Sequence, residues 1–293
     1  MHAPKIAVLG EVLFDSFADG VQVLGGAPFN VAWHLQAFQQ QGLFISRIGQ
    51  DAGGNEVLSA MQAWGMNTAG MQRDPIYPTG TVQISLLDGE PHYSILDHQA
   101  YDYIDVDAMP EFEAPWLYHG SLAFRHDSAQ QKFLKWRQTY QGKIFVDINL
   151  RAPWWSYDQL QTLLIGADWL KLNQEELHLL NPNGINSQEQ VWSLIACYSL
   201  SAVVLTQAAG GAQLYTAEGG VLTVRPQQRT DIVDAVGAGD AFAAICLLGL
   251  MANWPQNLML ERAQEFASAI LAQRGAIVTQ PDFYQSFIRQ WQI

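Results

Sequence analysis

Short runs of apolar residues alternate along most of the chain with stretches whose apolar residues recur at helical spacing. The apolar runs predict buried strands over residues 5–10, 43–49, 116–120, 143–149, 168–173 and 202–206. The amphipathic stretches predict helices over residues 30–39, 55–64, 128–140, 187–199, 238–250 and 261–273. Strands that alternate with helices in this way form a parallel sheet covered on both faces, so the pattern predicts an α/β fold. Ligands of such sheets bind at the carboxyl ends of the strands.

One segment departs from this alternation. Residues 79–95 read TGTVQISLLDGEPHYSI, which is two β-type runs joined at Asp88-Gly89. An Asp-Gly pair between such runs is a strong hairpin signal, and a hairpin inserted in an α/β chain is typical of a lid, a sheet extension or a dimer contact. We therefore expect one domain over residues 1–293 with a small β-rich lid, built from segments near 11–24 and 79–105.

Composition narrows the class of protein. Hydrophobic residues make up 49% of the chain, which is enough to bury a large core, and the net charge of −13 with a pI near 4.8 disfavours nucleic-acid partners. The longest apolar run, residues 241–252, is shorter than the roughly 18–20 residues of a membrane span, and Gly10, Glu11 and Asp15 interrupt the N-terminal run where a signal peptide is apolar. We expect a cytoplasmic protein with no membrane partner, whose two cysteines, Cys197 and Cys246, are buried thiols.

A glycine-rich run near the C-terminus, DIVDAVGAGDAF over residues 231–242, precedes a long apolar helix. Glycines at a helix entry let backbone N–H groups converge on an anion. Asp240 in this run has two possible roles, as a helix cap or as a general base aimed at a hydroxyl, and local spacing alone favours the cap. The run lacks the third glycine of a dinucleotide fingerprint, and no Walker-type loop is present.

A second glycine-rich segment, Gly25-Gly26-Ala27-Pro28-Phe29-Asn30, also precedes an apolar helix. Two glycines allow a ligand to approach the backbone closely, and Pro28 suits a helix entry. Asp15, which follows the first predicted strand, has the chemistry to bind two sugar hydroxyls. Taken separately, these features are typical of a turn before a helix and of a solvated carboxylate.

In chain order, however, the segments resemble the ribokinase-like (PfkB) carbohydrate kinases, and the fructokinase branch most closely. The resemblance runs from about residue 6 to residue 276. Its motifs are Gly10-Glu11 with Asp15, the Gly-Gly-x-x-x-Asn loop that ends at Asn30, residues 47–51 (RIGQD), the Asp-x-Asn-x-Arg run from Asp147 to Arg151, the Asn-x-x-Glu segment from Asn173 to Glu176, and Asp-x-x-Gly-Ala-Gly-Asp from Asp234 to Asp240.

The resemblance implies a three-layer sandwich with a mostly parallel central sheet, and the transfer of a phosphoryl group from ATP to a sugar. It also reverses the interpretation of Asp240, which it implies is the base that takes the proton from the sugar hydroxyl. The amides of Ala238, Gly239 and Asp240, with Gly237 shaping the turn, would stabilise the transferred group. Glu176 would act on Mg²⁺ through water.

Further site residues follow from the same resemblance. The expected sugar contacts are Asp15, Gly25, Gly26, Asn30, Tyr93, Asn149 and Arg151. The expected nucleotide contacts are Lys171, Asn173, Glu176, Thr206, Ala208, Gly211, Gly239 and Ser268. The expected cofactors are ATP and Mg²⁺, a K⁺ ion held by carbonyls of Asp234 and Val236 is left open, and the inserted hairpin predicts a homodimer through the lid.

Three departures from the family pattern bear on function. The nucleotide strand ends Thr206-Gln207-Ala208 where the family usually has Thr-x-Gly, and Ala235 stands where many members have Thr. The lid segment 92–95 (HYSI) lacks the Arg that sugar-acid kinases use to bind a carboxylate, which favours a neutral sugar, with fructose first. A catalytically silent sugar- or nucleotide-binding protein on the same fold, and a sugar-acid or nucleoside kinase, remain as alternatives.

Overall fold

The computed structural model describes residues 3–87, 90–226 and 232–293, so the turn predicted at Asp88-Gly89 lies outside the described residues. Within them the strands are β1 Ile6–Leu9, β2 Leu13–Phe17, β3 Gln22–Gly25, β4 Gly42–Gly49, β5 Met71–Asp74, β6 Gly80–Leu87, β7 Glu90–Ile95, β8 Trp116–His119, β9 Lys143–Asp147, β10 Trp169–Asn173, β11 Ala202–Thr206, β12 Ala212–Thr216 and β13 Val221–Val224. The α-helices are α1 Ala27–Ala37, α2 Ala52–Ala63, α3 Asp127–Arg137, α4 Tyr157–Leu164, α5 Gln174–Leu180, α6 Ser187–Tyr198, α7 Ala238–Met251, α8 Gln256–Ile270 and α9 Pro281–Trp291. Short 3-10 turns are η1 Ala100–Tyr103, η2 Val106–Ala108, η3 Leu122–Phe124 and η4 Ala208–Gly210.

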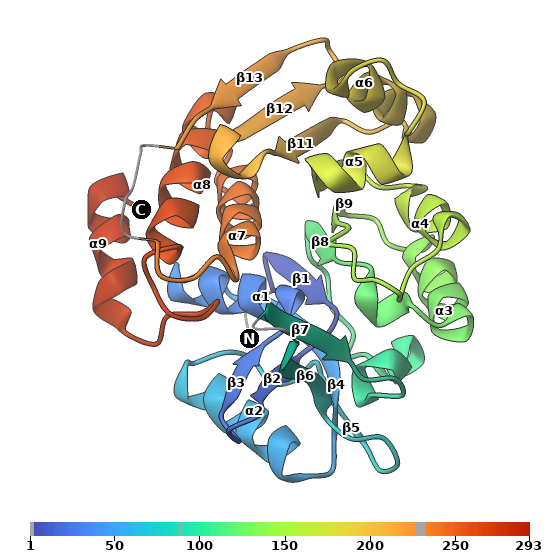
Figure 1. The fold of residues 1–293 in the computed structure, drawn as a ribbon, viewed down its shortest axis with the longest axis vertical. Helices are drawn as coiled ribbons and strands as arrows, with labels where there is room; N and C mark the ends of the chain where they lie inside the picture. The colour runs from blue at the N-terminus through green and yellow to red at the C-terminus, as the bar shows by residue number, and fades with distance from the viewer. Residues whose placement is uncertain (1–2, 88–89, 227–231) are drawn as a thin grey trace.

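A large sheet runs through the middle of the molecule (Figure 1). Its nine strands lie in the order β13-β12-β11-β10-β9-β8-β1-β4-β5. The pairs from β11 through β5 are parallel, whereas β12 runs antiparallel to both of its neighbours. The sheet is therefore mostly parallel, as the sequence pattern predicts.

The inner strands of this sheet are buried on both faces, which explains why they read as continuous apolar runs. The end strands, β5 and β13, are largely half-buried or exposed. In β1, Ile6 and Val8 belong to one core cluster, whereas Ala7 and Leu9 belong to the other. The first cluster includes side chains of α1, α7, α8 and α9, and the second includes side chains of α3, α4, α5 and α6. Figure 1 shows these two groups of helices on opposite sides of the sheet. The fold is a three-layer α/β sandwich of the ribokinase-like kind.

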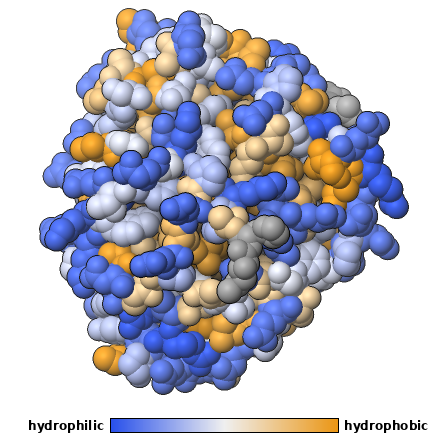
Figure 2. Space-filling model, turned by 180° about the vertical axis from the view of Figure 1, so that it is seen from behind, coloured by the Kyte–Doolittle hydropathy of each residue, from blue (hydrophilic) through white to orange (hydrophobic). Residues whose placement is uncertain are grey.

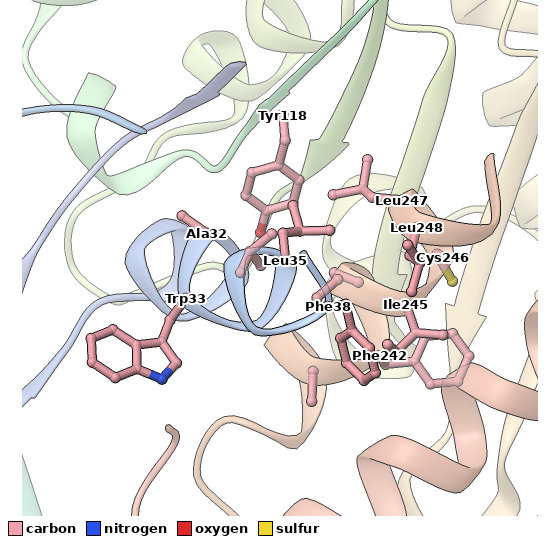
Figure 3. Close-up of a cluster of buried hydrophobic side chains, with 14 of the residues drawn as sticks. Ala32, Trp33, Leu35, Phe38, Tyr118, Phe242, Ile245, Cys246, Leu247 and Leu248 are labelled. Atoms are coloured by element: carbon pink, nitrogen blue, oxygen red, sulfur yellow. The ribbon is translucent and has the colours of Figure 1, made fainter. Parts of the chain in front are cut away.

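The contact between α1 and α7 matters most for the site, because both helices begin at glycine-rich segments. Figure 3 shows Leu35 of α1 and Phe38, which follows α1 directly, packed beside Phe242 and Ile245 of α7. All four of these side chains are buried. This packing fixes the position of one helix start relative to the other.

A smaller sheet of four strands, in the order β3-β2-β6-β7, lies apart from the large one (Figure 1). β2 pairs parallel to β6 and antiparallel to β3, and β6 pairs antiparallel to β7. Both segments that we expect to form the lid thus contribute strands to this sheet. That the sheet moves as a lid stays a prediction.

The structure corrects several helix boundaries. α1 begins at Ala27 rather than at residue 30, and α2 begins at Ala52 rather than at 55, because the helices include Pro28 and the pair Gly53-Gly54 in their first turns. These residues read as turn signals in a sequence, yet proline is compatible with the first turn of a helix. Three helices, α4, α5 and α9, escaped prediction.

The two cysteines differ in their exposure to solvent. Cys246 is buried, but Cys197 is exposed. The expectation of two buried thiols is therefore wrong for Cys197, which lies near the C-terminal end of the half-buried helix α6.

On the face shown in Figure 2, hydrophobic residues form small patches separated by hydrophilic ones. Among the described residues, we find no helix with the length and apolar character that crossing a membrane requires.

Candidate active site

Polar residues gather where the parallel strands end. Because β9, β10 and β11 run in the same direction, Asp147, Asn173 and Thr206 lie at one edge of the sheet, and Asn173 is directly opposite Thr206 in the β-ladder. A surface pocket of about 800 Å³ opens at the other edge, beside Lys5 and Gly142, which precede strands. Because binding sites of such sheets lie at the carboxyl ends, the polar edge is the candidate site.

Asp240 lies in the first turn of α7, at the level of this edge. The N-cap of α7 is Gly237, which has a φ of 80°, and no side chain caps the helix start. The capping role that local spacing favours for Asp240 is therefore wrong. A Cβ at position 237 would collide with Ala276, so both the left-handed backbone and the lack of space require glycine here.

The carboxylate of Asp240 is held from α1. Asn30 Nδ2 donates a hydrogen bond of 2.7 Å to Asp240 Oδ2, while the other amide atom, Asn30 Oδ1, is buried without a hydrogen-bond partner. Burial raises the pKa of Asp240 to about 6, an effect that the hydrogen bond from Asn30 opposes. At pH 7 this group is ionised, and it is a stronger base than an ordinary aspartate.

A buried ion pair lies beside the start of α7. Lys171 Nζ of β10 is 2.7 Å from Asp147 Oδ2 of β9, and both residues are directly opposite one another in the sheet. Burial alone would lower the pKa of Lys171, but Asp147, Glu176 and Asp240 together raise it. The Lys171 ammonium lies 3.6 Å from the place that a Cβ on Gly239 would take, so a cation faces the glycine of the α7 entry.

Asn173 and Glu176 form a capping box at the start of α5. Glu176 N donates to Asn173 Oδ1 at 2.9 Å, and Asn173 N donates to Glu176 Oε2 at 2.8 Å. The other oxygen, Glu176 Oε1, accepts from Leu150 N at 2.8 Å. Both oxygens of this buried carboxylate are thus occupied by backbone amides, and a metal would reach Glu176 through a water rather than directly.

The second glycine-rich segment meets Asp15 and Asn30. A Cβ added to Gly25 would lie 3.9 Å from Asp15 Oδ2 and 3.8 Å from Asn30 Oδ1, so both polar side chains lie close to this glycine. Gly26 caps α1 with a φ of 109°, and a Cβ there would lie 2.8 Å from Glu11 O. Burial raises the pKa of Asp15 to about 6. Asp15 is therefore not the solvated carboxylate that its sequence context suggests.

Arg151 supplies positive charge to this group of acids. It is exposed, and its charge lowers the pKa values of Glu11, Asp15 and Asp240, each of which burial raises. Asn149, two residues earlier, adopts a φ of 41° just beyond the end of β9. The left-handed backbone at Asn149 turns the chain at the edge of the sheet.

Tyr93 lies apart from the other expected sugar contacts. It is 55% exposed on β7, where it pairs across the sheet with Ile84, which in turn pairs with Phe17. Asp15 precedes Phe17 by two residues on β2, so Tyr93 and Asp15 share a face of the small sheet at different levels. No contact between Tyr93 and another expected site residue is present among the described interactions.

The expected nucleotide contacts lie around the end of β11 and on α8. Ala208 begins the turn η4 with a φ of 46°, and Gly211, with a φ of 91°, ends it. Thr206 Oγ1 donates to Leu172 O at 3.4 Å, which ties β11 to β10. Ser268, which accepts a hydrogen bond of 3.2 Å from Gln264, is buried on α8, the helix that packs against α7 and β13.

The loop before α7 is held by Asp234. Its Oδ1 accepts from Val236 N and its Oδ2 accepts from Gly275 N, both at 3.0 Å. The carboxylate therefore shapes the loop, and the backbone carbonyls of Asp234 and Val236 are the atoms left to bind a cation. Val236 itself is 42% exposed.

Two residues of this region escaped the list of expected contacts. The sequence shows Asp147 only as the first residue of a motif. Its ion pair with Lys171 could not be predicted, because that pair depends on the register of two strands. Glu11 is 4% exposed, its Oε2 has no hydrogen-bond partner, and burial raises its pKa to about 7. A glutamate directly after a buried strand was the available signal for Glu11.

Comparison with known proteins shows the family of this chain. The model of the pfkB family of carbohydrate kinases matches residues 11–282. Similar proteins include the fructokinase of Klebsiella pneumoniae, 28% identical over 94% of this chain and 96% of the relative, and the aminoimidazole riboside kinase of Salmonella typhimurium, 26% identical over 94% of this chain and 92% of the relative.

Solved structures agree on the fold. The fructokinase with bound ATP from Xylella fastidiosa has a TM-score of 0.86 at 22% identity, and the match covers 98% of this chain and 99% of that one. The fructokinase of Vibrio cholerae O395, in its form bound to fructose, ADP and calcium ion, has a TM-score of 0.82 at 22% identity over 97% and 99% of the two chains. Since the family model spans most of the sequence, the chain belongs to the pfkB family of carbohydrate kinases.

Proposed function

We propose that this kinase transfers the γ-phosphoryl group of ATP to a hydroxyl of a neutral sugar, with fructose or a related ketose as the favoured substrate. The observation that carries the proposal is the carboxylate of Asp240, set at the start of α7 and held by Asn30 at 2.7 Å. A pKa of about 6 keeps this carboxylate ionised at neutral pH. The sugar-loop residue and the proposed base are thus in direct contact.

In the proposed reaction, Asp240 accepts the proton of the sugar hydroxyl as that oxygen bonds to the γ-phosphorus. The bond from the γ-phosphorus to its bridging oxygen breaks, and ADP leaves with the electron pair. The backbone amides of Ala238, Gly239 and Asp240, at the positive end of α7, stabilise the charge on the transferred group. Gly237 shapes the turn that exposes these amides.

Lys171, Asn173 and Glu176 would serve the phosphates and the metal. The position of Lys171 Nζ near Gly239 supports a contact with a phosphate beside the start of α7. When bound with ATP, Mg²⁺ would offset part of the negative charge of the phosphates. The donor set fits it through water, since the Glu176 oxygens accept from backbone amides and Mg²⁺ retains several waters in proteins.

Thr206, Ala208, Gly211 and Ser268 would contact the remainder of the nucleotide. A K⁺ ion at the carbonyls of Asp234 and Val236 would lie beside the loop that leads into α7. Its support is that the Asp234 carboxylate is already occupied by two backbone amides, which fixes that loop.

The charges around the expected sugar contacts support a neutral substrate. Asp15 and Asp240, whose pKa values of about 6 leave them ionised at neutral pH, would repel an anionic sugar. Arg151, which is exposed, lowers the pKa values of Glu11, Asp15 and Asp240, and Lys171 also lowers that of Asp240. Fructose is favoured because several relatives over nearly the full chain are named fructokinases, at 25–28% identity.

A riboside is the second candidate substrate. The aminoimidazole riboside kinase is as similar, at 26% identity, as one of those fructokinases. Asp15, Gly25 and Asn30 would contact the hydroxyls of either ring. A catalytically silent binding protein would not require the contact between Asn30 and Asp240, and family membership favours the enzyme.

A substrate panel tests the proposal. ADP release is measured in a coupled assay with Mg-ATP and a set of ketoses, aldoses, sugar acids and nucleosides. Turnover of fructose or another ketose, with no turnover of sugar acids, supports the proposal. Preferred turnover of a nucleoside replaces it with the second candidate, and preferred turnover of a sugar acid contradicts the neutral-substrate argument.

The small sheet would also form a homodimer contact. Its support is a set of exposed apolar side chains on β2, on β7 and in the β2–β3 turn: Phe17 at 39%, Tyr93 at 55% and Val21 at 48% exposure. The mass in solution tests this directly. A monomeric mass at assay concentration contradicts the dimer without affecting the proposed reaction.

A further inference from the structure

A cluster of two histidines and an aspartate lies outside the site described above. Asp97 and His98 follow β7, the last strand of the small sheet, whereas His126 immediately precedes α3. One ligand atom from each residue lies within 4.8 Å of those of the other two. Imidazole nitrogens and carboxylate oxygens are the ligands that zinc and its neighbours in the first transition series take in proteins.

The distances match those between ligands that share one ion. His126 Nε2 lies 3.0 Å from Asp97 Oδ1, and His98 Nε2 lies 3.7 Å from Asp97 Oδ2. Two ligands that are each about 2.0–2.1 Å from a tetrahedral zinc lie about 3.3 Å apart. The observed distances lie on either side of this value, and each oxygen of the carboxylate faces one imidazole nitrogen.

His126 Nε2 is shielded from solvent and makes no hydrogen bond to the two carboxylates beside it. It lies 3.0 Å from Asp97 Oδ1 and 3.7 Å from Asp102 Oδ2. A buried polar atom without a partner is costly, and one reason for its presence is an ion that the atom binds. An ion bound by both His126 Nε2 and the Asp97 carboxylate would give this nitrogen a partner.

His98 is oriented by a neighbour, as metal-binding histidines usually are. Its Nδ1 lies 2.6 Å from the hydroxyl of Tyr103, and the Tyr103 ring stacks on Tyr77 at 3.9 Å between centroids. When Nδ1 carries the proton and donates it to Tyr103, Nε2 keeps its lone pair for a metal. An outer hydrogen bond of this kind fixes the tautomer and raises the affinity for the metal.

The surrounding charge admits a cation. The nearest positive group, the Arg125 guanidinium, lies 3.9 Å from Asp97 Oδ1, but Asp102 pairs with it through bonds of 2.7 Å and 2.6 Å. The whole chain carries a net charge of −13. Beside this cluster, the two carboxylates of Asp97 and Asp102 outnumber the single guanidinium of Arg125.

We propose that Asp97, His98 and His126 bind one divalent transition-metal ion, with zinc favoured, and leave its fourth position to water. The ion joins the end of β7 to the start of α3, and thus ties the small sheet to the helices on one face of the large sheet. The proposal concerns a site separate from the phosphoryl-transfer residues, and it does not depend on the identity of the sugar.

The test is calorimetric titration of Zn²⁺ into the full-length protein after chelator treatment, without nucleotide. We expect one equivalent to bind to the parent. His126→Gln and His98→Asn should each raise the Kd by at least about a hundredfold, because losing an outer partner alone costs 10–100-fold. Tyr103→Phe, which removes only that outer partner, should raise it about 10–100-fold. Asparagine is chosen for His98 because it tolerates the φ of 55° there.

His178→Gln, at an exposed histidine on α5, is the matched control and should leave the Kd unchanged. As a second measurement, Zn²⁺ should raise the Tm of the parent and of the control but not of the two ligand variants. Zinc binding that persists unchanged in His126→Gln and His98→Asn would overturn the site. The site would also be overturned if the parent showed neither a heat of binding nor a Tm shift with about tenfold excess of Zn²⁺, Co²⁺ or Ni²⁺.

Discussion

The side-chain amide of Asn30 donates a hydrogen bond of 2.7 Å to the carboxylate of Asp240, across 210 residues of sequence. The bond joins the first turns of α1 and α7, each of which follows a glycine-rich segment. The group proposed to contact the sugar therefore also sets the charge state of the group proposed to activate it.

The pH dependence of turnover should report this bond. In the parent, kcat/KM is expected to fall as the pH drops through about 6, because Asp240 must be ionised to accept a proton. The bond from Asn30 stabilises the carboxylate and opposes the rise in its pKa, so Asn30→Ala should move the acidic limb to higher pH. Gln36→Ala, on the same helix, is the control. An acidic limb that does not move in Asn30→Ala contradicts the assignment.

Asp240 should cost the folded protein stability. Its pKa is about 6 in the folded state against 3.8 for an ordinary aspartate, so the folded protein binds the proton more tightly than the unfolded chain does. This tighter proton binding stabilises the folded protein fully below pH 3.8, and the stabilisation is lost as the pH rises through 6. At pH 8, Asp240→Asn should therefore have a free energy of unfolding on the order of 2–3 kcal/mol higher than the parent, measured by urea denaturation. Near pH 3.8 the two proteins should differ little. Equal stability at pH 8 would contradict the buried, ionised carboxylate.

Removal of Lys171 should destabilise the protein strongly. Lys171→Met leaves the Asp147 carboxylate, which is 1% exposed, without its ion-pair partner. A buried charge left in this way costs about 3–5 kcal/mol. Lys143→Met, at an exposed lysine that begins β9, should change stability by less than about 0.5 kcal/mol. Adding Asp147→Leu to Lys171→Met should restore much of the lost stability. If Lys171→Met alone is as stable as Lys143→Met, the ion pair is not buried in solution.

Ala208 should be a point of backbone strain. Its φ of 46° lies in the left-handed region, which costs a residue with a Cβ about 1–2 kcal/mol. Ala208→Gly should relieve that strain and, after the entropy cost of glycine of about 0.4–1 kcal/mol, stabilise the protein slightly. Ala209→Gly, at the next residue of the same turn, should destabilise it. Urea unfolding compares the two, and a loss of stability in Ala208→Gly at least as large as that in Ala209→Gly would contradict the strain.

The sequence predicted six strands of the large sheet, β1, β4, β8, β9, β10 and β11, because they are buried and read as apolar runs. It did not predict β5, β12 and β13, and β5 and β13 are largely half-buried or exposed. Helix starts were less predictable, since Pro28 and Gly53-Gly54 lie inside first turns where their turn signals mislead. The capping box of Asn173 and Glu176 was readable from its Asn-x-x-Glu spacing.

Other features of the site depend on pairings between distant segments. Lys171 meets Asp147 only because β9 and β10 are adjacent in a given register, and the Glu11 backbone lies against Gly26, at the start of α1. His98 and His126 come together because the chain after β7 returns to the start of α3. No local pattern contains this information.

The central claim is that Asp240 is the base of sugar phosphorylation, and one comparison tests it most directly. ADP release with Mg-ATP and the best sugar of the panel is measured for the parent, for Asp240→Ala and for Asp282→Ala, an exposed aspartate in the first turn of α9. We expect Asp240→Ala to lower kcat by about 10²–10⁴-fold and Asp282→Ala to leave it unchanged, with both variants folded by circular dichroism. A kcat for Asp240→Ala within about tenfold of the parent would contradict the claim.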